Sequence, residues 1–191
     1  MKILKGLIKI KDFLFGSIIG HIIYSKQYFP KGKWFKKWYS VGYSWVMPDF
    51  WGRVLFKRNK GVKWPCSPYS NVGKNIVFDN DDLNNFQGIG NYFQTWDARI
   101  HIGKGTYIAS GVGIITSNHD INDLSLRTKA VDVKIGEKCW VGMNSIILPG
   151  VELGNHTIVG AGSIVTKSFP NGEVIIAGNP ARIIRYLNEE G

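Results

Sequence analysis

Few side chains in this sequence offer an imidazole or a thiol for acid–base or metal chemistry near neutral pH. They are four histidines and two cysteines: His21, His101, His119, His156, Cys66 and Cys139. Their positions lack the spacing of metal ligands, so we expect no bound metal. A histidine titrates close to neutral pH and is therefore the usual general base. His119 is the candidate for that role, because it lies in Asn118-His119-Asp120, where an irregular segment begins.

The surroundings of His119 supply further candidates. A catalytic histidine is normally oriented through its second ring nitrogen. Asp120 and Asp123 are the nearby carboxylates for that contact, and Asn118 is a candidate for positioning a substrate. Acidic side chains in loops are also commonly only solvated, and the sequence leaves both interpretations open.

The element that must position these residues is a repeat with a period of six. Its apolar positions are Ile135, Val141, Ile147, Leu153, Val159 and Val165, and the spacing recurs at Ile102, Ile108 and Ile114. A period of six fits neither an amphipathic helix nor a simple alternating strand. It predicts a β-solenoid in which three hexads make one coil and each apolar side chain points inward. The repeat by itself fits a rod without chemistry equally well.

One interruption of the repeat argues against a plain rod. The interval between Ile114 and Ile135 is not a multiple of six, so the segment between them must bulge out as a loop. Loops that project from a rigid repeat scaffold commonly carry the functional site. His119 stands at the start of this loop, which we place at residues 117–134.

Composition and charge limit the other possibilities. The chain has 191 residues, of which 44% are hydrophobic, and a formal net charge of +10, so one domain with an appendage is expected. Residues 1–74 hold 15 basic and 2 acidic residues (+13), and residues 75–191 hold 9 and 12 (−3). Because the basic charge is confined to the first part, we expect no nucleic-acid partner. Two cysteines cannot form a disulfide framework, which favours a reducing compartment.

The basic segment at residues 1–64 has features of a membrane-surface element. Apolar residues recur at helical spacing through residues 3–18, with lysines between them. The longest run without a formal charge, residues 13–25, is shorter than the roughly 20 residues of a membrane-spanning helix. No small-residue cleavage site follows it, so a signal peptide is disfavoured too. The aromatic and basic residues that follow favour contact of residues 1–60 with an anionic membrane, or a cap on the end of the solenoid, or both.

The repeat and its surroundings resemble a known family. The matching text is NHD at 118–120, VKIGEKCWVGMNSIILPGVELG at 133–154, VGAGSIVTKSFP at 159–170 and AGNPARIIR at 177–185. It resembles the hexapeptide-repeat acyltransferases, in particular the maltose, galactoside and surface-polysaccharide sugar O-acetyltransferases. The resemblance implies a left-handed parallel β-helix, a homotrimer, and acetyl-CoA as acyl donor in a cleft between adjacent subunits.

The resemblance also implies roles for individual residues. His119 would be the general base, and the backbone N–H of Met143 would stabilise the thioester oxyanion. The residues implied at the acetyl-CoA site are Trp140, Gly142, Met143, Gly160, Ala161, Thr166, Lys167, Arg182 and Arg185. Those expected to bind the acceptor are Asn91, Trp96, Asp97, Asn118, Asp120 and Asp123. Trp96 is suited to stacking on a sugar ring, or it packs between coils.

The C-terminal segment reads as a helix. Asn179 is a good N-cap and Pro180 a good first helical residue, which predicts a short helix to about residue 188. Such a helix would cover the last coil and bring Arg182 and Arg185 to the cofactor cleft. The chain thus divides into an N-terminal segment (1–64), the repeat (65–178) and a C-terminal helix (179–191).

Taken together, these features predict an acetyl-CoA-dependent O-acetyltransferase. Its acceptor would be a sugar hydroxyl of a capsule, lipopolysaccharide or exopolysaccharide, or of its precursor. We expect a cytoplasmic enzyme, peripheral on the inner face of the plasma membrane. The alternatives are N-acylation of a nucleotide-linked amino sugar, serine acetylation, for which the chain lacks the usual large helical domain, and a non-catalytic solenoid that binds a partner.

Overall fold

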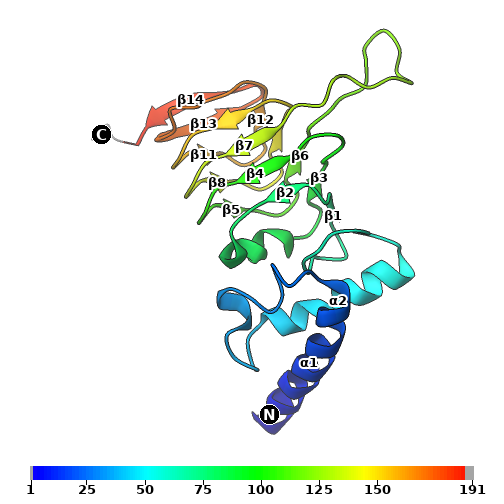
Figure 1. Ribbon diagram of the computed structural model, residues 1–191. Coiled ribbons are helices and arrows are strands. Elements are labelled where there is room, and N and C mark those ends of the chain that lie inside the picture. The colour runs from blue at the N-terminus through cyan, green and yellow to red at the C-terminus, as the bar shows by residue number, and fades with distance from the viewer. Residues whose placement is uncertain (1, 188–191) are drawn as a thin grey trace.

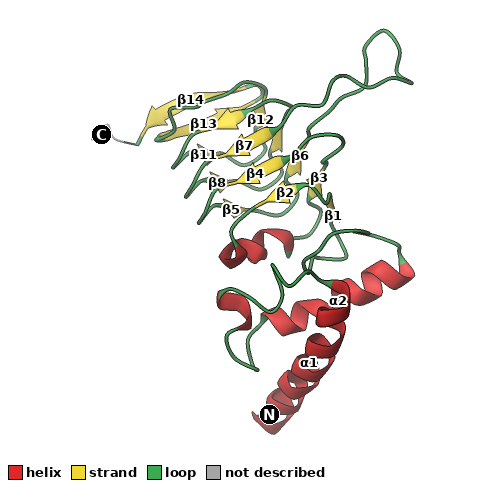
Figure 2. Ribbon diagram, in the orientation of Figure 1, coloured by secondary structure: helices red, strands yellow, loops and turns green. Residues whose placement is uncertain are grey.

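The computed structural model describes residues 2–187, which form three β-sheets of short strands with helical segments at one end (Figures 1 and 2). The helical segments are α1 (Lys2–Ile23), η1 (Lys33–Phe35), α2 (Gly42–Leu55) and η2 (Asn80–Phe86). The strands are β1 (Asn71–Val72), β2 (Ile76–Val77), β3 (Tyr92–Phe93), β4 (Ile100–Ile102), β5 (Tyr107–Ile108), β6 (Gly113–Ile114), β7 (Val133–Ile135), β8 (Trp140–Val141), β9 (Ile146–Ile147), β10 (Glu152–Leu153), β11 (Ile158–Val159), β12 (Ile164–Val165), β13 (Val174–Gly178) and β14 (Ala181–Tyr186).

Through the middle of the chain, strands three apart pair with one another, as β3 does with β6 and β4 with β7. Sheet A contains β1, β3, β6, β9 and β12; sheet B contains β2, β4, β7 and β10; sheet C contains β5, β8, β11, β13 and β14. From β3 to β11 the chain visits the three sheets in a constant order, and each set of three strands is here called a coil. The pairing between successive coils is parallel.

The period of six matches the length of one side of a coil. The apolar residue of each hexad points inward and lies above its equivalent in the next coil. In sheet C this gives the buried row Ile108, Val141, Val159 and Ile176, and in sheet A the row Val72, Phe93, Ile114, Ile147 and Val165. The inward positions predicted from the hexads are therefore confirmed.

Glycine in the hexads is required by the close approach of the coils. At Gly136 an added Cβ would lie 2.6 Å from the backbone nitrogen of Asn155 in the next coil. Any side chain there would push the two coils apart, and each coil depends on its neighbour to bury its inner row.

The aromatic residues of the N-terminal segment cover the first coil. Tyr28 stacks on Phe78, with ring centroids 5.0 Å apart, and meets Trp64 edge-on at 5.0 Å. Trp64 is 2% exposed and contacts Phe86 of η2 at 5.3 Å. These side chains act as a cap on the hydrophobic core, one of the two interpretations of the segment.

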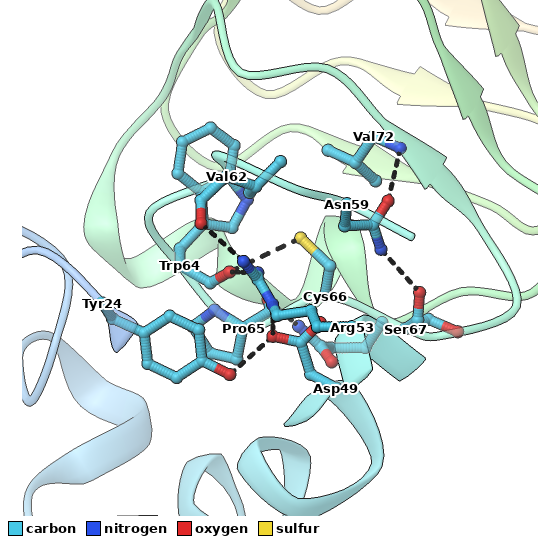
Figure 3. Close-up of polar contacts among 11 residues, drawn as sticks. Tyr24, Asp49, Arg53, Asn59, Val62, Trp64, Pro65, Cys66, Ser67 and Val72 are labelled. Atoms are coloured by element: carbon cyan, nitrogen blue, oxygen red, sulfur yellow. Dashed lines mark hydrogen bonds and ion pairs between the residues drawn. The ribbon is translucent and has the colours of Figure 1, made fainter. Parts of the chain in front are cut away.

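A buried polar network joins α2 and the end of α1 to segment 62–64, which leads into the coils (Figure 3). Asp49 of α2 is 1% exposed; its Oδ2 accepts hydrogen bonds from the Tyr24 hydroxyl at 2.5 Å and from Arg53 Nε at 2.8 Å. Arg53 also donates to the carbonyl oxygens of Val62, at 2.9 Å, and Trp64, at 3.1 Å. Because one guanidinium bridges the carboxylate and segment 62–64, the helices and the coils are held in a fixed relation.

The prediction of a C-terminal helix is wrong within the described residues. The chain turns at Asn179-Pro180 and returns as β14, antiparallel to β13 in sheet C. The edge of β13 offers unpaired backbone N–H and C=O groups, and the adjacent β-branched residues Ile183 and Ile184 suit a strand. The end predicted near residue 188 lies outside the described residues.

The segment that breaks the repeat leaves the coils as a long arm. It connects β6 in sheet A to β7 in sheet B, and Figure 1 shows it extending well beyond the sheets. The loop predicted at 117–134 ends slightly earlier, since Val133 and Lys134 already belong to β7. We call residues 116–132 the arm.

Among residues 2–187, α1 included, no helix is both long enough and apolar enough to cross a membrane.

Candidate active site

His119 lies on the arm with one ring nitrogen occupied and the other available. Its Nδ1 is 2.7 Å from the carbonyl oxygen of Leu124. A carbonyl only accepts, so Nδ1 must carry the proton of the neutral ring, and the lone pair then sits on Nε2. The residue is exposed, so Nε2 can take a proton from a bound hydroxyl group.

Backbone hydrogen bonds between the two sides of the arm stabilise its conformation. His119 and Arg127 form an antiparallel bridge, and the Asp120 N–H donates to the Leu126 carbonyl at 3.1 Å. Thr128 N–H donates to the Asn118 carbonyl at 2.9 Å. His119 thus stands on a short two-stranded ladder.

The predicted carboxylate partners of His119 have other roles. Asp120 accepts from the Asn122 N–H at 2.8 Å, and Asp123 accepts from the N–H and hydroxyl of Ser125 at 2.9 and 2.6 Å. These hydrogen bonds from Ser125 hold the pKa of Asp123 below its usual value. The contact that orients His119 comes instead from the backbone carbonyl of Leu124. Because every residue type has a backbone carbonyl, this contact could not be predicted from the sequence.

Trp96 and Arg127 form a contact beside His119 that the sequence did not reveal. The Arg127 guanidinium lies 3.7 Å from the centroid of the Trp96 ring, a cation–π arrangement. Trp96 is 40% exposed and belongs to the segment between β3 and β4. Arg127 therefore covers one face of the Trp96 ring, so a sugar could stack only on the other face. Asp97 follows Trp96 in a left-handed conformation, with φ 53°, and is exposed.

The root of the arm is anchored by Gln94, which sequence analysis also missed. Its Oε1 accepts from the backbone N–H groups of Thr116, at 2.9 Å, and Ser117, at 3.0 Å. Its Nε2 donates to the Ser117 carbonyl at 3.1 Å. Both ends of this buried amide have hydrogen-bond partners at the start of the arm, so the direction in which the arm leaves the coils is fixed.

Asn91 is not placed to bind an acceptor. It is 2% exposed, its Oδ1 accepts from the Val112 N–H at 3.1 Å, and its Nδ2 donates to the Asn85 carbonyl at 3.5 Å. Its amide satisfies backbone groups at a corner of the coils. This burial decides against a direct contact with an acceptor.

The corner after β8 presents the predicted oxyanion donor. Met143 is exposed, its carbonyl accepts from the Gly162 N–H at 2.8 Å, and its own N–H makes no hydrogen bond within residues 2–187. Gly142, which precedes Met143, packs closely on the next coil. Its N–H donates to the Val159 carbonyl at 2.8 Å, and an added Cβ would lie 2.6 Å from the Ala161 nitrogen, so this glycine serves coil stacking.

The other residues predicted at the acetyl-CoA site lie on sheet C or at the corners that follow β11 and β12. Trp140 is 57% exposed on the outer face of sheet C. The remainder occupy coil corners or the strand β14: Gly160, Ala161, Thr166, Lys167, Arg182 and Arg185. All but Gly160, which is half-buried, are exposed. A cavity of about 280 Å³ lies between Lys167 and the β13–β14 hairpin.

Within one chain the structure does not bring all these residues together. Figure 1 shows the arm and the hairpin β13–β14 extending to opposite sides of the sheets. His119 belongs to the arm, and Arg182 and Arg185 belong to β14. His119, Trp96 and the arm form one group. Trp140, Arg182 and Arg185 lie on sheet C, with Met143 at the corner after β8, and form another.

The other histidines have contacts of their own. His101 Nε2 is 3.1 Å from Asp132, His156 Nδ1 contacts Glu173, and His21 Nδ1 is 2.6 Å from the Ser17 carbonyl. In the part of the chain that the structure describes, no cluster of three or more histidine, cysteine or acidic residues could hold a metal ion.

Comparison with known proteins identifies the repeat. The family model described as bacterial transferase hexapeptide (six repeats) matches residues 132–167. The "Putative acetyltransferase YJL218W" of Saccharomyces cerevisiae is 35% identical over 126 residues, 64% of this chain and 61% of that protein. The galactoside O-acetyltransferase of Escherichia coli is 34% identical over 125 residues, 63% of this chain and 59% of that protein.

A relative from polysaccharide biosynthesis matches as well. The "Putative lipopolysaccharide biosynthesis O-acetyl transferase WbbJ" of Escherichia coli is 36% identical over 132 residues, 62% of this chain and 64% of that protein. The chain thus spans 59–64% of the length of these three relatives. Residues 132–167 are a bacterial transferase hexapeptide repeat, and the resemblance of this chain to the hexapeptide-repeat sugar and polysaccharide O-acetyltransferases is confirmed.

Proposed function

We propose that this protein transfers an acetyl group from acetyl-CoA to a sugar hydroxyl of a cell-surface polysaccharide or its precursor. The observation that carries the proposal is the state of His119. Its Nδ1 is held by the Leu124 carbonyl at 2.7 Å, and its Nε2 makes no hydrogen bond within residues 2–187. The arm that carries it projects from a hexapeptide-repeat scaffold. The relatives named for galactoside and lipopolysaccharide acetylation support the substrate class.

In the proposed reaction His119 moves one proton. Nε2 accepts the proton of the sugar hydroxyl as its oxygen attacks the thioester carbonyl. The Met143 N–H donates to the carbonyl oxygen as it becomes negative. The C–S bond then breaks, the proton passes from Nε2 to the leaving thiolate, and an acetyl ester and free CoA result. The thioester is already activated, so direct transfer needs no covalent enzyme intermediate.

We propose a homotrimer as the active form, because one chain holds only part of the site. The outer row of sheet A is largely apolar (Tyr92, Gly113, Ile146 and Ile164), and that of sheet C is apolar as well (Tyr107, Trp140, Ile158 and Ile175). The outer row of sheet B carries His101, Lys134 and Glu152 and suits water. Two apolar faces and one polar face are what a three-sided subunit needs in a closed threefold ring.

In such a ring the arm of one copy can meet sheet C of the next. His119 would then face Met143 and Trp140 of its neighbour, with Lys167, Arg182 and Arg185 available for the CoA phosphates. The proposed acceptor contacts remain Asn118, Asp120, Asp123, Trp96 and Asp97. The left-handed winding of the coils, the cytoplasmic location and the peripheral membrane contact stay predictions.

Glycan analysis of cells with and without the gene tests the function. We expect the surface polysaccharide of the parent strain to carry an extra acetyl group on one sugar, absent from the deletion strain and restored by the intact gene. Mild alkali removes an ester and spares an amide, so the same sample separates O- from N-acetylation. Identical glycans in both strains would rule out the proposal, and an alkali-stable group would favour amino-sugar acylation.

Arg127→Ala is expected to lower kcat/KM by about threefold to tenfold without lowering the melting temperature. The cation–π contact with Trp96 contributes about 0.5–2 kcal/mol to holding the arm, and its loss lets His119 drift from the reacting oxygen. Steady-state kinetics with both substrates measures the change. Lys129→Ala, which removes the same charge from the arm but not the contact with Trp96, is the matched control. Equal losses in both variants would assign the effect to charge alone.

A further inference from the structure

Helix α1 has two apolar faces, of which only one is covered. The covered face packs on α2 and the aromatic cluster; Phe13 meets Tyr43 at 5.0 Å, and Gly16 and Gly20 are buried. The opposite face carries aliphatic residues at intervals of three or four: Ile3, Leu7, Ile10, Leu14, Ile18 and Ile22. We call these six residues the outer stripe. They are 44–82% exposed, although α1 is already anchored without them.

The outer stripe continues onto α2 through aromatic contacts. Phe15, beside the stripe, lies 5.6 Å from Phe50, and Phe50 lies 5.1 Å from Trp51. Trp51 is 48% exposed, and the exposed run Val54, Leu55 and Phe56 follows at the end of α2. Two helices therefore present one apolar surface, at the end of the molecule away from β14 (Figure 1).

Positive charge accompanies this surface. Lys11 lies next to the outer stripe, and the exposed residues Lys57, Arg58 and Lys60 follow directly after Phe56. Residues 1–74 carry +13, while the rest of the chain carries −3. An apolar helical face bordered by lysine, arginine and tryptophan is the pattern of a helix that lies in the interface of an anionic bilayer.

We propose that the outer stripe and the end of α2 dock on an anionic lipid bilayer. The inference goes beyond the proposed function, since it concerns where the catalytic coils are held and not the reaction. A second copy of this chain is a poorer occupant, because pairing two such surfaces would bring two segments of +13 together. The bilayer buries the aliphatic side chains and neutralises the cations at once.

The polar network around Asp49 gives this docking a structural consequence. Arg53 ties α2 to the carbonyl oxygens of Val62 and Trp64, so the helices do not swing freely on a linker. A bilayer bound by the helices would therefore hold the coils, and the arm with His119, at a set height above the lipid. That placement suits an acceptor carried on a membrane lipid.

Vesicle sedimentation with the full chain tests the proposal. We expect binding to vesicles of phosphatidylglycerol and phosphatidylcholine, weak binding to phosphatidylcholine alone, and a decrease with added salt. The triple variant Leu7→Glu, Leu14→Glu, Ile18→Glu should lose roughly tenfold or more of its partitioning, because the three positions are exposed and lie in the stripe. Its circular dichroism should match that of the parent protein.

A charge-matched control separates apolar docking from simple attraction. Tyr69→Glu, Val77→Glu and Ile89→Glu add the same charge at exposed apolar positions outside α1 and α2, and this variant should keep most of its binding. Equal losses in both triple variants, or no binding of the parent protein to anionic vesicles, would overturn the proposal. A change of oligomer mass in the stripe variant without vesicles would also overturn it, in favour of a second copy on this face. Because vesicle binding is measured without acetyl transfer, its outcome is independent of the proposed reaction.

Discussion

Replacing His119 with alanine is expected to lower the rate of acetyl transfer by about 10²–10⁴-fold, the usual contribution of a positioned general base. The imidazole is held through Nδ1 by the Leu124 carbonyl, so its loss removes the acceptor for the hydroxyl proton while that carbonyl stays exposed to water. The side chain is exposed and packs against no core residue, so folding and assembly should be unchanged. Release of CoA in the presence of the acceptor measures the rate.

His101→Ala provides the matched control for this experiment. His101 lies on the outer face of sheet B, 3.1 Å from Asp132, and belongs to neither group of site residues. We expect close to normal turnover in this variant. If His119→Ala turned over as fast as the parent enzyme, the proposed mechanism would be abandoned.

Replacing Arg53 with alanine is expected to lower the free energy of unfolding by about 3–5 kcal/mol, as when one partner of a buried ion pair is removed. Asp49 is 1% exposed and would keep only the Tyr24 hydroxyl at its Oδ2 (Figure 3). The carbonyl oxygens of Val62 and Trp64 would also lose a donor. Urea denaturation followed by tryptophan fluorescence measures the loss.

The deficit of the Arg53→Ala variant should depend on pH. Burial raises the pKa of Asp49, and the positive charge of Arg53 opposes that rise. For a carboxyl whose folded pKa is raised, the stabilising contribution is present at low pH and is lost as the pH rises through the folded value. Without Arg53 the raised pKa moves further up, so the deficit should be largest near neutral pH and shrink on acidification.

The double variant Arg53→Ala, Asp49→Asn removes the buried charge together with its partner. It should recover part of the stability at neutral pH and lose the pH dependence of the deficit. Arg58→Ala, an exposed position a short way along the chain, should change stability little. A deficit that stayed constant or grew on acidification would contradict the assignment of the cost to the Asp49 carboxylate.

Predictions from the sequence were confirmed where the same pattern of apolar residues recurs many times. The hexads place Ile135, Val141 and Ile147 at inward positions, and all three are at most 3% exposed. These residues lie on the three different sheets of the coils, and each stacks on the equivalent residue of the neighbouring coil, so one arrangement buries every apolar side chain. The break in the period likewise located the arm, because a rigid repeat cannot absorb extra residues inside a coil.

Single local signals were less reliable. Asn179-Pro180 is a good start for a helix, yet the segment after it pairs with β13. The open edge of β13 offers more hydrogen bonds than a short exposed helix can make with itself. The prediction that Asn91 binds the acceptor also relied on a local signal. An asparagine suits a binding role, but this side chain is buried at a coil corner.

The site shows the same division between local chemistry and distant contacts. His119 was recognisable because residue type, motif and break in the period agree at one position. Three other features could not be recognised from the sequence: the Leu124 carbonyl, the Arg127–Trp96 contact and the Gln94 anchor. A backbone carbonyl is present in every residue type, so it gives no signal. Arg127 and Trp96 are brought together only by the path of the arm.

The sequence by itself determined the coil architecture, the arm and the candidate base, because each rests on a periodic pattern or on the chemistry of one side chain. Only the tertiary structure decided the strand at β14, the orientation of His119 and the separation of the two groups of site residues. It also showed that α1 keeps one apolar face uncovered after the other has packed. These features depend on which backbone groups and faces remain unpaired once the coils have formed, and that is a property of the folded chain as a whole.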